Sequence, residues 1–480
     1  MKQRIILLAG VIIAIGLLLA LLLPSLISAL PGQVRGRLPD ELLRAITTPL
    51  PTALPAPIAA VEATPIPLEQ LLSAKSVATV TATVTPTAVL PSATPPATAR
   101  ATSPPIDAED YCPVPESDCT LPVDILPAST AAEPSATIAP TANPTASATA
   151  TSNPPPLPQK VIITGLTVVP QKFNNCGSAN MSVMLNYYGQ PHTQIDISNT
   201  IKPHYDDRNV TPEELVAYVN EQTDLRAAVF RGGDRELLRT LIQAGFPVIV
   251  EKGYEPDEWQ GWMGHYLTLI GYDDQVQQFT SLDTYLGPWD SSGRPISYDE
   301  LTFRWAQFNH TFLVVYRSFE EEEVVGLLGP AYTQQALMWQ NAAAAAESAL
   351  AAQPDDTFAW FNLGASLTEL GKLNDDDALY TAAAAAFDQS RLVGLPPRML
   401  WYQFQPYTAY IKSGRIDEAL ALASAVMQSD GGWHVEESHF YQGLAYEAAG
   451  NPDLAHSAYK RALDIKPGFQ EAQGALEGLN

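Results

Sequence analysis

The segment from Thr47 to Gln159 restricts most strongly what this chain can fold into, because it consists largely of threonine, proline, alanine and serine. A segment with so few aromatic residues cannot bury enough apolar surface to offset the conformational entropy lost on folding. Of the 480 residues, about 320 therefore remain for globular domains. We predict a disordered stalk over residues 31–160, followed by folded domains over 161–320 and 330–480.

An apolar run from Ile5 to Leu23 follows Lys2 and Arg4 and continues with little interruption to Leu30. It is long enough to span a bilayer and exceeds the apolar core of a signal peptide, about 7 to 15 residues. Residues 1–30 are therefore predicted to form a signal anchor that crosses the cell membrane once. Basic residues flank both sides of the run and do not decide its orientation, but the stalk and the cysteine usage favour extracytoplasmic C-terminal domains. Secretion after signal-peptide cleavage is the alternative.

The chain carries a formal net charge of −25. Beyond Lys160 it has 41 acidic and 19 basic residues, so nearly all of the excess acid lies in the predicted folded domains. This balance argues against nucleic acid or an anionic membrane surface as the main partner. A solvated acidic surface is the simplest interpretation.

Two of the three cysteines, Cys112 and Cys119, lie within the predicted stalk. In an oxidising compartment they could close a small disulfide and leave Cys176 as the free thiol. Two unpaired thiols are the alternative. No histidine or third cysteine lies near them, and the sequence indicates neither a metal site nor a cofactor.

Cys176 lies at a turn that opens directly into a predicted helix. In the stretch QKFNNCGSANMSVMLNYYG, from Gln171 to Gly189, turn formers surround the cysteine and apolar residues then recur at helical spacing until the last glycine. At a helix N-terminus the exposed N–H groups and the dipole favour the thiolate, which is the reactive form. The Gln171 amide can turn toward the same point and donate to an oxyanion. Alone, the pattern also fits a small buried cysteine that begins a core helix.

A predicted hairpin later in the chain brings a histidine next to an aspartate. The segment GHYLTLIGYDDQVQQFTSLD contains two apolar runs separated by a three-residue loop, residues 273–275. If Tyr272 pairs with Val276, then His265 lies directly opposite Asp283 and both side chains share a face of the sheet. Such a carboxylate can hold the imidazole in one tautomer and stabilise the imidazolium formed when the histidine takes the cysteine proton.

The order Gln171, Cys176, His265, Asp283, the CG pair before a helix ending in YYG, and the GHYLTLIGYD strand resemble cysteine peptidase family thirty-nine, over about residues 161–317. That family comprises papain-like bacteriocin-processing peptidases and similar domains. The resemblance implies that Cys176 is the nucleophile, His265 the general base and acid, Asp283 the orienting residue and Gln171 part of the oxyanion hole.

The chain departs from that family at three points. Many members carry Asp before the cysteine and Pro after the CG pair, where this chain has Asn175 and Ser178. Family bacteriocin processors are usually fused to an export ATPase, yet this chain has no GxxxxGK[ST] stretch. These departures argue against cleavage of a bacteriocin leader peptide.

Further helices and strands surround the two motifs. A capping box at Thr211–Glu214 begins a helix over Glu213–Glu221, and a strand follows at Leu225–Phe230. The runs FPVIVEKGY and FNHTFLVVYR read as additional strands. A helix carrying the cysteine, packed on an antiparallel sheet carrying the histidine and aspartate, is the α+β arrangement of papain-like cysteine peptidases.

Beyond Glu320 the pattern changes to helices alone. An alanine-rich helix is predicted over Tyr332–Ala352, and the segment Glu437–Gly468 has the spacing of small residues and the final proline of a tetratricopeptide repeat. A similar unit begins near Trp360 and is followed by an insertion at residues 374–377; a degenerate unit runs from Met399 to Gln428. Such an all-α array can offer a groove to a peptide or protein partner, or it can buttress the preceding domain.

Two classes of function remain open. The first is a membrane-anchored, extracytoplasmic cysteine peptidase that hydrolyses a peptide substrate through a thiolate and a thioester, while the helical repeats bind substrate or a partner protein. The second is a catalytically inactive adaptor for protein–protein interaction at the cell surface. The complete set of four site residues favours the peptidase, and acyl transfer to an amine is a variant that the sequence leaves open.

Overall fold

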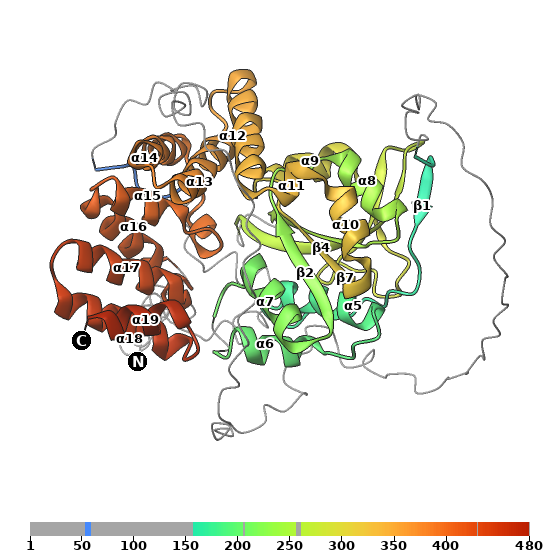
Figure 1. Cartoon of the computed structure of the whole chain (residues 1–480), viewed down its shortest axis with the longest axis horizontal. Helices are drawn as coiled ribbons and strands as arrows, with labels where there is room; N and C mark the ends of the chain where they lie inside the picture. The colour runs from blue at the N-terminus through green and yellow to red at the C-terminus, as the bar shows by residue number, and fades with distance from the viewer. Residues whose placement is uncertain (1–52, 59–156, 205–206, 256–260, 430, 480) are drawn as a thin grey trace, which may run out of the picture.

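The computed structural model describes residues 53–58, 157–204, 207–255, 261–429 and 431–479. They form an α+β region and, toward the C-terminus, a helical region (Figure 1). One continuous apolar core extends through both. The predicted fold class, an α+β domain with an antiparallel sheet followed by a helical domain, is confirmed for these residues. The predicted anchor at residues 1–30 and the two stalk cysteines lie outside the described residues. Within the described part of the chain, no helix combines the length and apolarity needed to cross a bilayer.

All strand pairs in the seven-stranded sheet are antiparallel, in the order β2-β7-β3-β4-β5-β6, with β1 paired to one end of β4. The strands are β1 (Lys160–Ile162), β2 (Leu225–Phe230), β3 (Val248–Tyr254), β4 (Met263–Asp273), β5 (Gln278–Leu282), β6 (Arg294–Ser297) and β7 (Phe312–Arg317). The long strand β4 is buried on both faces, as its continuous apolar run predicts.

Five helices accompany the sheet. They are α5 (Cys176–Tyr187), α6 (Gln194–Ile201), α7 (Pro212–Gln222), α8 (Arg235–Gln243) and α9 (Tyr298–Ala306). The predicted capping box begins α7, since Thr211 Oγ1 accepts from the Glu214 N–H and Glu214 Oε2 accepts from the Thr211 N–H at 2.7 Å. Helix α5 packs across β4, where Thr268 Oγ1 donates to Asn180 Oδ1 at 2.9 Å. The cysteine helix therefore lies on the central strand of the sheet.

The predicted register of the β4–β5 hairpin is wrong. Tyr272 pairs with Phe279 and not with Val276, and the loop occupies four residues, 274–277. The longer loop forms because Gln277 adopts a left-handed conformation (φ 53°), while Val276 remains 58% exposed in the turn. A bulge between Leu269 and Gly271 shifts the register again, so that Thr268 pairs with Leu282.

Helices connected by short turns make up the described residues after β7. They are α10 (Glu321–Leu328), α11 (Pro330–Thr333), α12 (Gln335–Ala352), α13 (Thr357–Asn374), α14 (Asp377–Val393), α15 (Gln405–Lys412), α16 (Ile416–Gln428), α17 (Glu436–Ala448), α18 (Pro452–Ile465) and α19 (Gln470–Gly478), with short 3-10 helices η3 (Ser318–Glu320), η4 (Pro397–Trp401) and η5 (Gly432–His434). The alanine-rich helix begins at Gln335, because the extended backbone of Gln334 separates it from α11. The predicted insertion at residues 374–377 contains the last residue of α13, the turn at Asp375 (φ 49°) and Asp376, and the first residue of α14.

Two parts of the predicted stalk, residues 31–160, are ordered. Residues 53–58 lie in extended form against the helical region, where the Leu54 side chain is 5% exposed. Lys160 begins β1 and pairs with Asp273 at the end of β4. The prediction of disorder fails at these two places because each short segment finds backbone hydrogen-bond partners on a folded surface, which composition alone does not reveal.

The two regions meet at an aromatic cluster. The ring of Trp262 lies between those of Phe308 and Phe358, with both centroid distances 5.6 Å, and its indole N–H donates to Gln307 Oε1 at 2.7 Å. Phe358 belongs to helix α13, whereas Trp262 directly precedes β4. The helical region therefore packs beside the beginning of the strand that carries His265.

Candidate active site

The fold places Cys176 as the first residue of α5, as predicted. The preceding turn requires a left-handed residue, and Asn174 supplies it at φ 54°. Helix α6 and the residue after it hold the turn: Lys202 Nζ donates to the Asn174 carbonyl at 2.7 Å, and Asn175 Nδ2 donates to the Gln194 carbonyl at 3.3 Å. The sulfur is thus positioned by contacts from a separate helix, and Cys176 remains partly exposed.

His265 and Asp283 come together although the predicted register is wrong. The Cα partner of His265 is Lys252 on β3, and Asp283 directly follows the last residue of β5. Extending the register at Thr268↔Leu282 would place Tyr285 opposite His265, two residues from the predicted position. A shift of two residues keeps the same face of the sheet. His265 Nε2 and Asp283 Oδ1 are therefore 3.0 Å apart, and both side chains are at least 96% buried.

The charges in the site favour a thiolate beside an imidazolium. Burial raises the pKa of the Cys176 thiol, but the hydrogen bond and charge of His265 outweigh it and leave the pKa below its ordinary value. Burial lowers the pKa of His265, but the charge and hydrogen bond of Asp283 raise it to about 9. Burial opposes ionisation of Asp283, yet His265 and the backbone N–H groups of Leu286 and Tyr285 hold its pKa well below the usual range.

Gln171 is anchored with its amide nitrogen left as a donor. Its backbone N–H donates to the Thr284 carbonyl at 2.8 Å, and its Oε1 accepts from Thr284 Oγ1 at 3.0 Å. The amide group of Asn180 connects three segments, because its Nδ2 lies 2.9 Å from the Cys176 carbonyl, 2.9 Å from the Tyr266 carbonyl and 3.2 Å from Thr284 Oγ1. The sequence analysis did not identify Asn180 or Thr284. Asn180 could have been identified, because it is a polar residue one turn after Cys176 in a mostly apolar stretch of the predicted helix.

The helical region contributes an aromatic ring next to the site. A Cβ added at Gly264, the residue before His265, would lie 3.0 Å from the ring of Tyr402, which follows η4. Burial raises the pKa of the Tyr402 phenol, and the Cys176 thiolate raises it further. Tyr402 was not predicted, because no local pattern relates it to a cysteine more than two hundred residues earlier.

A cavity of about 330 Å³ adjoins Asp283. Three basic side chains, Lys252, Arg294 and Arg304, line it together with three carboxylates, those of Glu255, Asp283 and Glu300. Lys252 is only 5% exposed, and burial lowers the pKa of its ammonium group to about 8. The charges of these side chains balance, so the lining indicates no preference for an acidic or a basic group.

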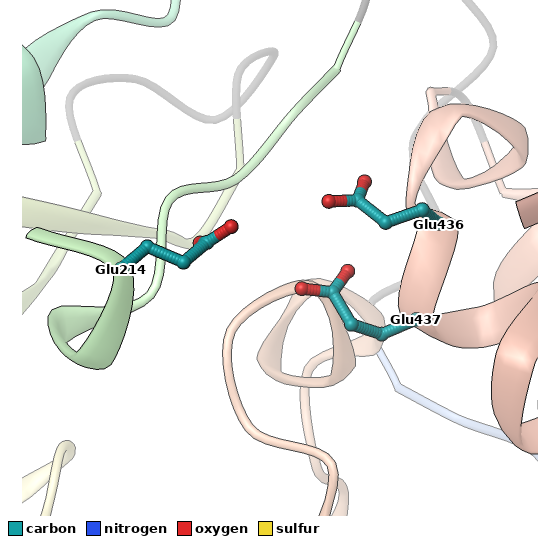
Figure 2. Close-up of side chains that lie close together, drawn as sticks. All are labelled: Glu214, Glu436 and Glu437. Carbon is teal, nitrogen blue, oxygen red and sulfur yellow. The ribbon is translucent and has the colours of Figure 1, made fainter. Parts of the chain in front are cut away.

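Three carboxylates meet where α7 approaches α17. Figure 2 shows Glu214 on one side of the junction and Glu436 and Glu437 on the other, and one oxygen from each lies within 4.8 Å of the others. This is the oxygen-rich arrangement that a hard cation prefers. However, Lys466 Nζ donates to Glu214 and lies 3.3 Å from Glu436 Oε1, and Asn209 Nδ2 donates to Glu437 Oε1 at 3.2 Å. The cluster thus already joins the two regions through the chain's own donors.

Comparison with known families agrees with the resemblance predicted from the sequence. Residues 153–313 match the model of the Peptidase_C39 like family, and residues 436–469 match that of the tetratricopeptide repeat. The first match spans the four predicted site residues, and the second spans α17 and α18. No curated protein matches the chain.

Three solved structures are similar to about a third of this chain. A protein from Bacillus anthracis assigned to the C39-like peptidases is 18% identical, with a TM-score of 0.28, over 33% of this chain and 98% of the other. The peptidase domain of Streptococcus ComA, a bi-functional ABC transporter, is 15% identical with a TM-score of 0.26, over 32% and 100%. The cysteine protease xylellain from Xylella fastidiosa is 12% identical with a TM-score of 0.26, over 34% and 87%.

Proposed function

Because the chain carries a Peptidase_C39-like domain, we propose that it is a cysteine peptidase that hydrolyses peptide bonds at Cys176. The observation that carries this proposal is the arrangement of His265 and Asp283, 3.0 Å apart and buried, beside a thiol with a lowered pKa. We further propose that residues 1–30 anchor the chain in the cell membrane and that the folded domains lie outside the cytoplasm. The tetratricopeptide region would bind the substrate or a partner protein.

In the proposed reaction, the Cys176 thiolate attacks the carbonyl carbon of the peptide bond and forms a tetrahedral oxyanion. The Gln171 amide nitrogen and the Cys176 backbone N–H are the candidate donors to this oxyanion. The His265 imidazolium then gives its proton to the departing amine, and a thioester remains on Cys176. Water, deprotonated by His265, attacks the thioester and releases the acid product, while the thiolate leaves. Asp283 stabilises the imidazolium that is present before the first proton transfer and that forms again in the second.

An adaptor without peptidase activity is the second candidate, and one observation favours it. Tyr402 of the helical region packs against Gly264 next to His265, so part of the surface around the site is covered by the chain itself. In this case the thiolate–imidazole pair would remain from an enzyme ancestor while substrate access is reduced.

The pH dependence of Cys176 alkylation by iodoacetamide tests the proposal, in a full chain with Cys112→Ser and Cys119→Ser so that only one thiol reacts. An alkylation pKa well below the roughly 8.5 of a free thiol, which rises in His265→Ala, would support the ion pair. His192→Ala is the control, because His192 contacts Tyr218 and not the site. A free-thiol pKa in both folded proteins would refute the proposal.

A peptide library then separates enzyme from adaptor. It should include acidic, basic and neutral residues on both sides of the scissile bond, because the charges that line the cavity beside Asp283 balance and indicate no preference. Cleavage that is lost in Cys176→Ala supports the peptidase. A low alkylation pKa without cleavage of any library peptide supports the adaptor.

A further inference from the structure

A short extended segment of the N-terminal half of the chain lies on the helical region. It comprises residues 53–58, with the sequence Ala-Leu-Pro-Ala-Pro-Ile. The Leu54 side chain is 5% exposed, whereas Ile58 at the other end is 67% exposed. The Leu54 N–H donates to the Leu395 carbonyl at 2.8 Å, two residues after the end of α14. One buried side chain and one backbone hydrogen bond therefore fix where the segment begins to bind.

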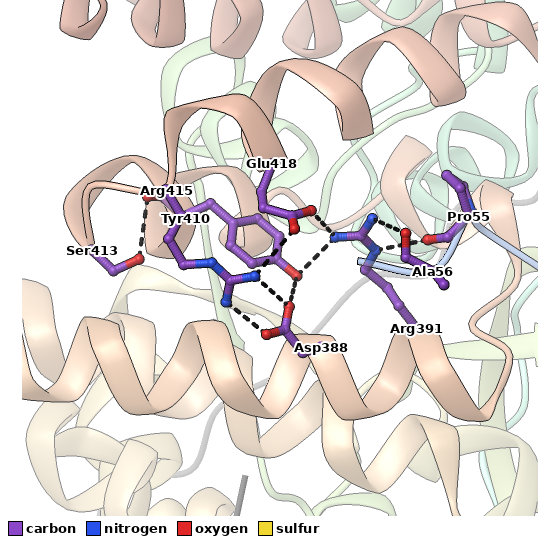
Figure 3. A network of polar contacts seen from close by, with 8 residues as sticks. All are labelled: Pro55, Ala56, Asp388, Arg391, Tyr410, Ser413, Arg415 and Glu418. Atoms are coloured by element: carbon purple, nitrogen blue, oxygen red, sulfur yellow. Dashed lines mark hydrogen bonds and ion pairs between the residues drawn. The ribbon is translucent and has the colours of Figure 1, made fainter. Parts of the chain in front are cut away.

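Arg391 binds the backbone of the two residues after Leu54, which are Pro55 and Ala56. Its Nε donates to the Pro55 carbonyl at 3.1 Å and its Nη2 to the Ala56 carbonyl at 3.3 Å (Figure 3). Carbonyls of consecutive residues suit the planar fork of a guanidinium, which a lysine ammonium cannot reproduce. The contact requires an extended backbone at these positions but no particular side chain at residue 56.

The helical region holds Arg391 in place for this contact. Its Nη1 donates to Glu418 Oε2 at 2.9 Å and to the Tyr410 hydroxyl at 3.1 Å, and the residue is only 3% exposed. Tyr410 in turn donates to Asp388, which also accepts from Arg415 (Figure 3). The two arginines balance the charge of the two carboxylates. The helices thus orient the Arg391 guanidinium, and its Nε and Nη2 atoms donate to residues 53–58.

We infer that this surface is a binding site for extended Leu-Pro-x peptides. It is formed by Arg391, Gly394, Leu395 and the residues that cover Leu54. The chain's own residues 53–58 occupy it. Proline at position 55 restricts Leu54 and itself to extended conformations, so little conformational freedom is lost on binding. The leucine supplies the apolar anchor, and its N–H supplies the one donor. This mode of recognition does not depend on the chemistry of Cys176.

The same tripeptide occurs once more in the chain. Leu126-Pro127-Ala128 repeats the sequence of Leu54-Pro55-Ala56. Leu-Pro pairs also begin at Leu38, Leu50, Leu90 and Leu121 of the predicted stalk, so a foreign peptide with a Leu-Pro-x sequence would compete with several tethered segments. If residues 1–30 are the membrane anchor, as proposed above, binding at residue 54 leaves only residues 31–52 to connect that anchor to the folded part.

The test uses the full chain in detergent and a fluorescent peptide with the sequence of residues 52–58. In a chain with Asp in place of Leu38, Leu50, Leu54, Leu90, Leu121 and Leu126 (the vacant chain), no Leu-Pro pair of residues 31–156 remains to occupy the site, and we expect the peptide to bind. Wild-type chain should bind it at least about tenfold more weakly, because the tethered segment competes at an effective concentration of order millimolar. Equal binding to both chains, or no binding to the vacant chain, would overturn the inference.

Two matched variants control for charge and for folding. Ile58→Asp adds the same charge to the same segment at an exposed position, and it should bind the added peptide as weakly as wild type does. The added peptide carrying Asp in place of its leucine should not bind the vacant chain. Hydrogen exchange at the Leu54 amide should be slow in wild type and independent of dilution. Loss of protection on dilution would assign the occupant to a second copy of the chain and overturn the intramolecular binding.

Discussion

Replacing Asp283 with asparagine tests whether the charge of this residue sets the protonation of the site. Asp283 Oδ1 lies 3.0 Å from His265 Nε2 and accepts from the backbone N–H groups of Tyr285 and Leu286, both at 2.9 Å. Asparagine has the same shape and keeps a carbonyl oxygen there, so all three hydrogen bonds can persist. The substitution therefore removes the negative charge with little change in geometry.

The expected effect is large because His265 is buried. With the carboxylate present, the pKa of His265 is about 9, whereas burial alone would lower it below 6.5. The hydrogen bond and charge of Cys176 also raise this pKa, so we expect the value in Asp283→Asn to fall from about 9 toward about 6.5. One pKa unit corresponds to about 1.36 kcal/mol, so the imidazolium loses roughly 3 kcal/mol of stabilisation. Cys176 loses its cationic partner, and the alkylation pKa of its thiol should rise toward about 8.5.

NMR titration of the imidazole and alkylation kinetics measure the two pKa values in the same protein. Because protonated His265 is the form stabilised by Asp283, the imidazolium–thiolate pair should persist up to about pH 9 in wild type and only to about pH 6.5 in the variant. Asp273→Asn is the matched control on the same hairpin, since Asp273 pairs with Lys160 and not with the site. A His265 pKa that stays near 9 in Asp283→Asn would refute the electrostatic reasoning.

Three further predictions concern other residues. Gln171→Ala should lower kcat by about 10²- to 10³-fold and leave the alkylation pKa of Cys176 unchanged, if Gln171 donates to the oxyanion. An increase in KM with kcat unchanged would contradict this role. Burial raises the pKa of Glu251 to about 8, so the folded chain retains a proton that the unfolded chain releases near pH 4.5, and stability should fall as pH rises between these values. Glu251→Gln should therefore flatten the decrease in Tm between pH 5 and pH 9, whereas the exposed control Glu255→Gln should not. Tyr402→Ala should speed alkylation of Cys176 by a bulky maleimide more than by iodoacetamide, while Tyr402→Phe should resemble wild type; equal acceleration of both reagents would contradict a steric role.

Local patterns in the sequence predicted the elements of the site well. The turn formers before Cys176 and the capping box at Thr211 gave helices that begin where predicted, within one residue. The strand at Leu225–Phe230 agrees at both ends. These features depend on neighbours within a few residues, and helix capping and strand periodicity are local effects.

Local patterns did not predict the register of the β4–β5 hairpin, yet His265 and Asp283 contact each other as predicted. Loop length depends on whether one residue, Gln277, adopts a left-handed conformation, which nothing in its type requires. A bulge between Leu269 and Gly271 then moves the register again. The side-chain pattern has a period of two, so the net error of two residues near His265 left Asp283 on the correct face.

The sequence alone was sufficient to predict that this chain combines an α+β region containing Cys176, His265 and Asp283 with a helical repeat region. The signals used, hydrophobic periodicity and helix-capping residues, depend only on residues that are close together along the chain. Only the tertiary structure could decide which distant groups meet. Tyr402 beside Gly264, Lys202 on the Asn174 carbonyl, and Arg391 on residues 55 and 56 are all contacts between separate elements. Such contacts depend on how helices and sheet pack around a shared core, and no spacing along the chain encodes that packing.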